Sequence, residues 1–263
     1  MTLSAESARA RHLETVAIEV ASTAADYVRS RSGQATPART KSSPTDVVTH
    51  TDMECEQLIR SELLARTPGS SIVGEEFEDD SGGNNVGWIV DPIDGTVNFL
   101  YDLPVVSVSI AATIEGRTVA GAVADIHRDE VFSAARDAGA RCAGEPISPT
   151  GIGDLRNALV ATGFAYDAEL RAAQAVVLTR LLPVCRDIRC MGSAALNLCW
   201  VGCGRLDAYF ERDLKLYDYA AGILIAAEAG AGVEPPSERA GNLTMVATPG
   251  LFDSLSRVLN RAR

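Results

Sequence analysis

Asp91-Pro92-Ile93-Asp94-Gly95-Thr96 lies between a predicted buried strand and a predicted short helix. The three residues before it, Trp88-Ile89-Val90, are apolar and predict the strand. Asp91 is therefore expected at the carboxyl edge of a sheet, where open α/β sheets bind ligands. Pro92 fixes φ and cannot continue a hydrogen-bonded ladder, so we expect it to force the chain off the strand.

The same hexapeptide carries the groups of a metal and phosphate site. Asp91 and Asp94 are three residues apart and can converge on one point across the expected turn. Gly95 lets the backbone approach a ligand closely, and the N–H groups of Gly95 and Thr96 would open a helix that binds an anion. Two hard oxygen ligands beside such a cradle indicate Mg²⁺ and a phosphate ester. The alternative is an ordinary surface turn, because D-P-x-D-G also suits one.

Further carboxylates stand at strand ends and helix starts elsewhere in the chain. Glu75 and Glu76 follow the short apolar run Ser71-Ile72-Val73, Glu211 ends a predicted strand that begins at 206, and Asp218 opens a small-residue helix. Such positions allow side chains from distant segments to meet. Taken singly, each of these residues is more often a solvated acid or a helix cap.

Taken together and in this order, the motifs resemble those of the inositol monophosphatase family, the Mg²⁺-dependent, lithium-sensitive phosphatases. The chain departs from the family pattern at Tyr217, where Trp is usual, and at Ser193, where many members have Thr. The resemblance rests on Lys41-Ser42-Ser43-Pro44-Thr45-Asp46-Val47-Val48-Thr49 running on to Asp52, Gly74-Glu75-Glu76, the hexapeptide continuing into Val97-Asn98-Phe99, Arg189-Cys190-Met191-Gly192-Ser193-Ala194-Ala195, Glu211 and the Asp218 motif.

The resemblance implies a role for each matching residue. Two or three Mg²⁺ ions per site would be held by Glu75, Asp91, the main-chain carbonyl of Ile93, Asp94 and Asp218. The residues implied to be catalytic are Asp52 and Thr96, which would orient the attacking water, together with Glu75. The implied substrate-binding residues are Ile93, Asp94, Gly95, Thr96 and Asp218 around the phosphate, and Gly192, Ser193, Ala194 and Glu211 near the hydroxyl groups of a polyol.

Several of these residues have other interpretations. Ser193 suits the N-cap of a helix. Glu211 could pair with a neighbour such as Arg212. Lys41 could lean toward the metal carboxylates, toward the phosphate, or simply into solvent. We assign His50 no role as a general base, because a metal activates water without a histidine.

Composition limits the classes of function. The chain has 263 residues, enough for one large domain or two closely packed halves. With 24 basic and 35 acidic residues, the formal net charge is −11 and no basic cluster is present. We therefore expect no nucleic-acid partner, and a phosphate dianion would need bound cations to reverse the local field.

The cysteines and the termini indicate a cytoplasmic protein. None of the six cysteines forms a C-x-x-C pair, which argues against zinc and favours free thiols in a reducing compartment. The first helix is charged throughout and does not read as a secretory signal. No segment approaches the roughly 20 uninterrupted apolar residues of a membrane span, so no membrane partner is expected.

The order of predicted elements indicates two halves. Residues 4–31 predict a helix, and Thr49 or Thr51 is expected to cap a second one. Strands are expected at 105–114, 118–126 and 130–135, and the turn-rich patch 144–153 is the expected boundary. Beyond it, strands near 158–162, 188, 206–210 and 244–247 alternate with helices at 168–182, 193–201 and 218–229, and a helix ends the chain.

The expected fold is an α+β half, residues 1–145, that carries most metal ligands and packs on an α/β half, residues 146–263, in a single phosphatase unit. This agrees with the layered αβαβα sandwich of the inositol monophosphatase and fructose-1,6-bisphosphatase type that the resemblance implies. The expected function is hydrolysis of inositol 1-phosphate to inositol and phosphate by two-metal activation of water. The alternatives are another small substrate (a sugar bisphosphate, histidinol phosphate or a 3′-phosphoadenosine nucleotide) or a regulatory binding protein. A homodimer through surfaces such as 161–165 is also expected.

Overall fold

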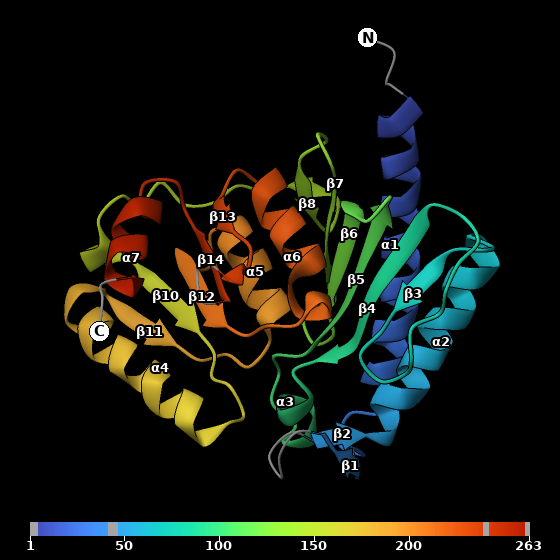
Figure 1. Cartoon of the computed structure of the whole chain (residues 1–263), viewed down its shortest axis with the longest axis horizontal. Coiled ribbons are helices and arrows are strands. Elements are labelled where there is room, and N and C mark those ends of the chain that lie inside the picture. The colour runs from blue at the N-terminus through green and yellow to red at the C-terminus, as the bar shows by residue number, and fades with distance from the viewer. Residues whose placement is uncertain (1–4, 42–46, 239–241, 261–263) are drawn as a thin grey trace.

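Two large sheets and three layers of helices alternate across the molecule (Figure 1). This computed structural model describes residues 5–41, 47–238 and 242–260, so Ser42 to Asp46 of the Lys41 motif and the first four residues lie outside the described residues. Helices α1 (Ala5–Arg29) and α2 (His50–Arg66) cover one sheet, α5 (Ala194–Gly202) and α6 (Leu216–Glu228) lie between the sheets, and α4 (Ala168–Leu181) and α7 (Phe252–Leu259) cover the other. The expected αβαβα sandwich is confirmed.

The first sheet has seven strands and is almost entirely antiparallel, since the β3–β4 pair alone runs parallel among those described. Its apolar residues alternate between two cores. Trp88 and Val90 face α1 and α2, whereas Ile89 faces α5 and α6. In spatial order the strands are β3 (Ser71–Val73), β4 (Val86–Asp94), β5 (Ser107–Ile114), β6 (Arg117–Asp125), β7 (Glu130–Ala135), β8 (Ala140–Cys142) and β9 (Glu145–Pro146).

The second sheet is mixed. Its strand β10 pairs in parallel with both β11 and β12, while β14 pairs antiparallel with β12 and β13. In spatial order the strands are β11 (Asp187–Arg189), β10 (Leu159–Thr162), β12 (Ala208–Arg212), β14 (Leu243–Ala247) and β13 (Gly232–Glu234). The division of the chain near residue 145 into two halves stays a proposal, although each sheet draws its strands from one side of that point.

The strands that sequence analysis missed are short and lie at edges. A two-stranded sheet of β1 (Pro37–Thr40) and β2 (Val47–Thr49) precedes α2, and β8, β9 and β13 have only two or three residues each. Their largely exposed or half-buried positions carry no clear alternation of apolar side chains. The chain also contains the short α3 (Thr96–Leu100) and two 3₁₀ turns, η1 (Leu155–Asn157) and η2 (Leu182–Val184).

The prediction that Pro92 ends its strand was wrong. β4 continues through Pro92 to Asp94, and the register slips so that Asp91 lies opposite Ser109 while Asp94 lies opposite Ser107. Two residues of β4, Pro92 and Ile93, thus lie opposite one residue of β5, Val108, which is a β-bulge. A bulge tolerates proline because the extra residue needs no ladder hydrogen bond.

All six cysteines are free thiols. Among the helices of the described residues, none is long and apolar enough to cross a membrane.

Candidate active site

The bulge in β4 places Asp91 and Asp94 on the same face of the sheet. Residues directly opposite one another share a face, and Ser107 and Ser109 are two apart in β5, so their partners Asp94 and Asp91 share that face too. Ser109 Oγ donates to the carbonyl of Tyr217 in α6, which identifies this as the face toward α5 and α6. Both carboxylates therefore point into the space between the two sheets.

Asp94 accepts hydrogen bonds from the start of α5. Ser193 Oγ donates to Asp94 Oδ2 at 2.5 Å, and the N–H groups of Ala194 and Ala195 donate to its two oxygens at 3.1 and 2.7 Å. Ser193 is also the N-cap of α5, because its hydroxyl accepts from the N–H of Leu196. Burial nevertheless raises the pKa of Asp94 above its ordinary value, and the hydrogen bonds from Ser193 and the backbone oppose this.

Asp91 is buried among other carboxylates. It accepts a hydrogen bond from the N–H of Ile93 at 3.1 Å, which fixes the turn inside the bulge. Burial raises its pKa well above the ordinary value, and the nearby charges of Glu75, Asp94 and Asp218 raise it further. Four acidic side chains thus influence one another across this space, and bound protons or a bound cation would offset such a concentration of negative charge.

Glu75 is fixed by its backbone N–H, which Glu56 binds, and by its carboxylate, which Lys41 contacts. The carboxylate of Glu56 accepts from the N–H groups of Glu75 and Glu76 at 3.1 and 2.7 Å, and a Cβ on Gly74 would lie 2.0 Å from it, so this turn requires glycine. Lys41 Nζ lies 2.7 Å from Glu75 Oε1 and 2.6 Å from Glu76 Oε1. Lys41 therefore contacts the expected metal carboxylate, the first of the interpretations left open above. Burial raises the pKa of Glu75 to about 7, against the opposing charge of Lys41.

Asp52 connects the start of α2 to the hexapeptide. Thr49 is the N-cap of α2, and Asp52 accepts from its N–H at 3.0 Å and from its hydroxyl, which completes a capping box. The other oxygen, Oδ1, accepts from Thr96 Oγ1 at 3.0 Å, and the Thr96 hydroxyl also lies 3.1 Å from the carbonyl of Ile93. Burial raises the pKa of Asp52 to about 6.

Asp218 reaches the site from the first turn of α6. Its Oδ2 accepts from the N–H of Lys215 at 2.6 Å, so the carboxylate also satisfies the helix end. Burial raises its pKa well above the ordinary value, and Asp94 and Glu75 contribute in the same direction.

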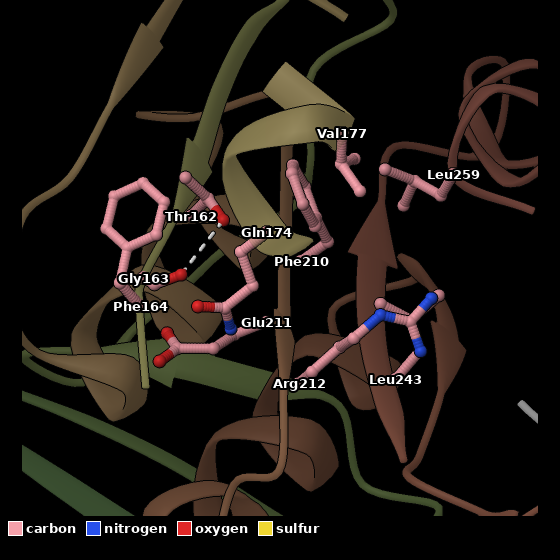
Figure 2. Close-up of a pocket in the computed structure, with 10 residues that line it drawn as sticks. All are labelled: Thr162, Gly163, Phe164, Gln174, Val177, Phe210, Glu211, Arg212, Leu243 and Leu259. Carbon is pink, nitrogen blue, oxygen red and sulfur yellow. Dashed lines mark hydrogen bonds between the residues drawn. The ribbon is translucent and has the colours of Figure 1, made fainter. Parts of the chain in front are cut away.

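Glu211 lies at the end of β12, beside Gly163. Figure 2 shows its carboxylate next to Gly163 and Phe164 in a pocket walled also by α4, while Arg212 extends away from it. Tyr209 OH donates to Glu211 Oε2 at 2.6 Å. Burial raises the pKa of Glu211 to about 7, and the Tyr209 hydroxyl opposes that rise.

Two glycines allow the loops of the site to approach one another. Gly95 has a φ of 104°, and a Cβ there would lie 2.9 Å from the carbonyl of Val105. Gly192 has a φ of 86° and packs against Asn98, whose Nδ2 donates to the carbonyls of Val105 and Met191. Asn98 thus joins the hexapeptide to the loop that leads into α5.

The donor set fits Mg²⁺ in its chemistry. Glu75, Asp91, Asp94, Asp218 and the Ile93 carbonyl supply only hard oxygen atoms, which Mg²⁺ prefers. In the described residues, however, no three His, Cys, Asp or Glu side chains are grouped ready to hold a metal ion. The hydrogen bonds explain why, since Asp94 is turned to the start of α5 and Glu75 to Lys41.

Sequence reasoning missed the residues that support the site rather than form it. Glu56 follows Asp52 by one helical turn, and Tyr209 precedes Glu211 by two residues in a strand, so both lie on the same face as a residue that had been singled out. That periodicity was a usable signal. Ser107 gave no such signal, because its contact with Asp94 at 3.3 Å depends on the register of the bulge.

Comparisons with known proteins agree with this fold. A sequence model described as the inositol monophosphatase family matches residues 9–260. The chain belongs to the inositol monophosphatase family. The inositol-1-monophosphatase SuhB of Mycobacterium tuberculosis (strain H37Rv) is 45% identical over 275 residues, which cover 95% of this chain and 93% of that protein.

Two further relatives differ in their names. The Nus factor SuhB of Escherichia coli (strain K12) is 39% identical over 187 residues, 70% of each chain. The solved structure of the extragenic suppressor protein suhB from Bartonella henselae superposes with a TM-score of 0.88 at 28% identity, and covers 96% of this chain and all of that one. Membership of the family supports a phosphatase.

Proposed function

We propose that this protein is a Mg²⁺-dependent phosphomonoesterase that hydrolyses inositol 1-phosphate to inositol and phosphate. The observation that carries the proposal is that Asp91 and Asp94 share one face of the bulge, within reach of the charges of Glu75 and Asp218, while Asp52 accepts from Thr96 of the same hexapeptide. When bound, Mg²⁺ would neutralise phosphate charge and lower the pKa of water to generate a nucleophile. The ligands would be the four carboxylates and the Ile93 carbonyl.

The chain's own residues would orient the reactants. Thr96 Oγ1 lies between Asp52 Oδ1 and the Ile93 carbonyl, so it can accept a hydrogen bond from a water molecule while its own O–H donates to Asp52. As that water attacks, its proton would pass to Thr96 Oγ1 and the Thr96 proton to Asp52 Oδ1. Asp52 would hold that hydroxyl in place and take up the proton. The N–H groups of Gly95 and Thr96 would bind phosphate oxygens, and Glu211 would accept from ring hydroxyls.

Release of phosphate from a panel of esters tests this proposal. Inositol 1-phosphate should be hydrolysed with Mg²⁺ present and should survive in EDTA. Equal rates in EDTA and in Mg²⁺ would contradict the metal-dependent mechanism. Faster hydrolysis of a sugar bisphosphate, histidinol phosphate or a 3′-phosphoadenosine nucleotide would keep the chemistry and change the substrate.

A second candidate function is a regulatory binding role. The relatives named Nus factor SuhB are 39–40% identical over about 70% of this chain and favour it. Failure of every ester, together with Mg²⁺ binding measured by calorimetry, would support this role over catalysis.

We also propose that the protein forms a homodimer through α4. Of the residues in this helix, Leu181 alone is buried, while Leu170 and Val176 are 45% and 50% exposed. Leu182 directly after it is 56% exposed, so the helix presents an apolar face that a second copy can cover. The segment 161–165 is a weaker candidate, because Ala161 and Thr162 are buried in the sheet.

A further inference from the structure

Tyr209 is a buried polar residue that the roles above do not use. It is the second residue of β12 and has no exposed surface, and its ring belongs to the core between the two sheets, against α5 and α6. A buried phenol needs a partner for its O–H group. That partner is Glu211 Oε2, at 2.6 Å.

The strand geometry explains this contact. Side chains two residues apart in a strand point to the same face, so Tyr209 and Glu211 both face the space between the sheets. Burial raises the pKa of Tyr209 well above its ordinary value, so the phenol keeps its proton and remains a donor at neutral pH. The carboxylate of Glu211 therefore meets a donor at Oε2, which leaves Oε1 as the oxygen that could accept from a ligand.

Two neighbours restrict Glu211 further. Gly163 at the end of β10 lies so close that a Cβ on it would be 1.9 Å from Glu211 Oε2. Thr244 of β14 lies directly opposite Glu211, and its buried hydroxyl has no hydrogen-bond partner among the described residues. Tyr209 rather than Thr244 thus supplies the donor that orients the carboxylate, and Gly163 supplies the space.

We propose that Tyr209 is a positioning residue that fixes the Glu211 carboxylate toward the hydroxyl groups of a cyclic polyol, and so sets the preference for polyol phosphates without touching the substrate. This inference rests on the proposed function, because it assumes that Glu211 contacts the polyol. It assigns Gly163 a matching role, that of leaving room for the carboxylate.

The test compares two esters in the wild type and in Tyr209→Phe. The substitution keeps the ring and removes only the hydroxyl. We expect KM for inositol 1-phosphate to rise about 10-fold with kcat changed less than twofold, because one hydrogen bond to a charged group is lost. Hydrolysis of phenyl phosphate, which has no ring hydroxyls, should keep its kcat/KM within twofold.

A matched control removes the same hydroxyl from another Tyr–Glu pair. Tyr27 OH of α1 donates to the carboxylate of Glu54 in α2, so Tyr27→Phe should leave both substrates unaffected. Gly163→Ala provides an independent variant, since the added methyl group must displace Glu211. It should lower kcat/KM for inositol 1-phosphate and spare phenyl phosphate. Equal effects of Tyr209→Phe on both esters, or none on either, would overturn the proposal.

A second measurement does not depend on activity. The carboxyl carbon of Glu211, assigned in ¹³C-glutamate spectra by its absence in Glu211→Gln, can be titrated in the full chain. Loss of the Tyr209 donor should raise the pKa of Glu211. An unchanged titration midpoint in Tyr209→Phe would refute the positioning role even if the wild type hydrolyses neither ester, whereas that inactivity would count only against the proposed function.

Discussion

Ser193 Oγ lies 2.5 Å from Asp94 Oδ2, although the two residues are 99 positions apart in the chain. The contact joins the bulge of one sheet to the helix that leads toward the other. Since Ser193 is also the N-cap of α5, one hydroxyl both satisfies a helix end and orients a carboxylate. Changes at either residue should therefore affect stability and activity in different proportions.

Asp94→Asn should remove nearly all turnover. The substitution replaces an anionic oxygen ligand by a neutral amide at nearly constant volume, and loss of one such group costs about 10²–10³ in rate. Phosphate release and a thermal melt would be measured on the same sample. A soluble variant that melts near the wild type and keeps more than about a tenth of its rate would show that Asp94 is not a ligand.

Ser193→Ala should lower the free energy of unfolding by about 1 kcal/mol, because α5 loses its N-cap. It should also lower kcat/KM for inositol 1-phosphate, since Asp94 loses a donor. Asp167→Ala is the control, because Asp167 caps α4 through the N–H groups of Glu169 and Leu170 away from the carboxylates. Urea unfolding should show a comparable loss in both variants. An equal loss of activity in Asp167→Ala would mean that destabilisation alone explains the Ser193 effect.

Lys41→Met should destabilise the protein in EDTA by about 1–3 kcal/mol, because Glu75 and Glu76 lose a charged partner at largely buried positions. The loss should be smaller in Mg²⁺, which would supply the missing positive charge. Urea unfolding at pH 8 with and without Mg²⁺ measures the difference. Arg156→Met, which breaks an exposed ion pair with Asp154, should leave the midpoint unchanged. The same loss in Mg²⁺ as in EDTA would argue against a cation beside Glu75.

The melting temperature in EDTA should fall as pH rises from 5 to 8. The folded chain holds the pKa values of Asp52, Glu75 and Glu211 at about 6, 7 and 7, above their ordinary values. Between the ordinary pKa values of the unfolded chain and these raised values, the folded state binds more protons than the unfolded state. The free energy of unfolding therefore falls as pH rises through that range. Mg²⁺ favours the ionised carboxylates and should flatten the dependence. Calorimetric scans in EDTA that show the opposite slope would contradict the burial of these groups.

Val176→Asp should convert a dimer into monomers, because it places a charge on the exposed apolar face of α4. Sedimentation at micromolar concentration in Mg²⁺ measures the mass. Leu64→Asp is the control on α2, at the opposite end of the molecule in Figure 1. A wild-type mass near 27.8 kDa, that of one chain, would exclude the dimer.

Local patterns predicted much of this fold. The apolar spacing of α1 and the positions of β5, β6 and β7 followed from periodicity, and Thr49, one of two candidates, is the cap of α2. The order of elements also indicated the layered architecture. The edge strands could not be predicted, because two or three half-exposed residues carry no periodic signal.

The site was predictable in its residue types but less so in its contacts. Acidic residues at strand ends and helix starts indicated where Asp91, Glu211 and Asp218 would stand. Which donor each carboxylate meets depends on pairings between distant segments, such as Asp94 with α5 or Glu75 with Lys41. No window of sequence contains both partners of those contacts.

The bulge at Pro92 determines which face of β4 the side chains of Asp91 and Asp94 occupy. A regular strand returns a side chain to the same face only at even separations, whereas Asp91 and Asp94 are an odd number of residues apart. The extra residue absorbs that mismatch, since a regular ladder over the same residues would turn Asp94 toward α1 and α2. The bulge is therefore constrained as tightly as the identity of either acid, and a change that straightened β4 without removing a residue would disable the site while leaving both aspartates in the sequence.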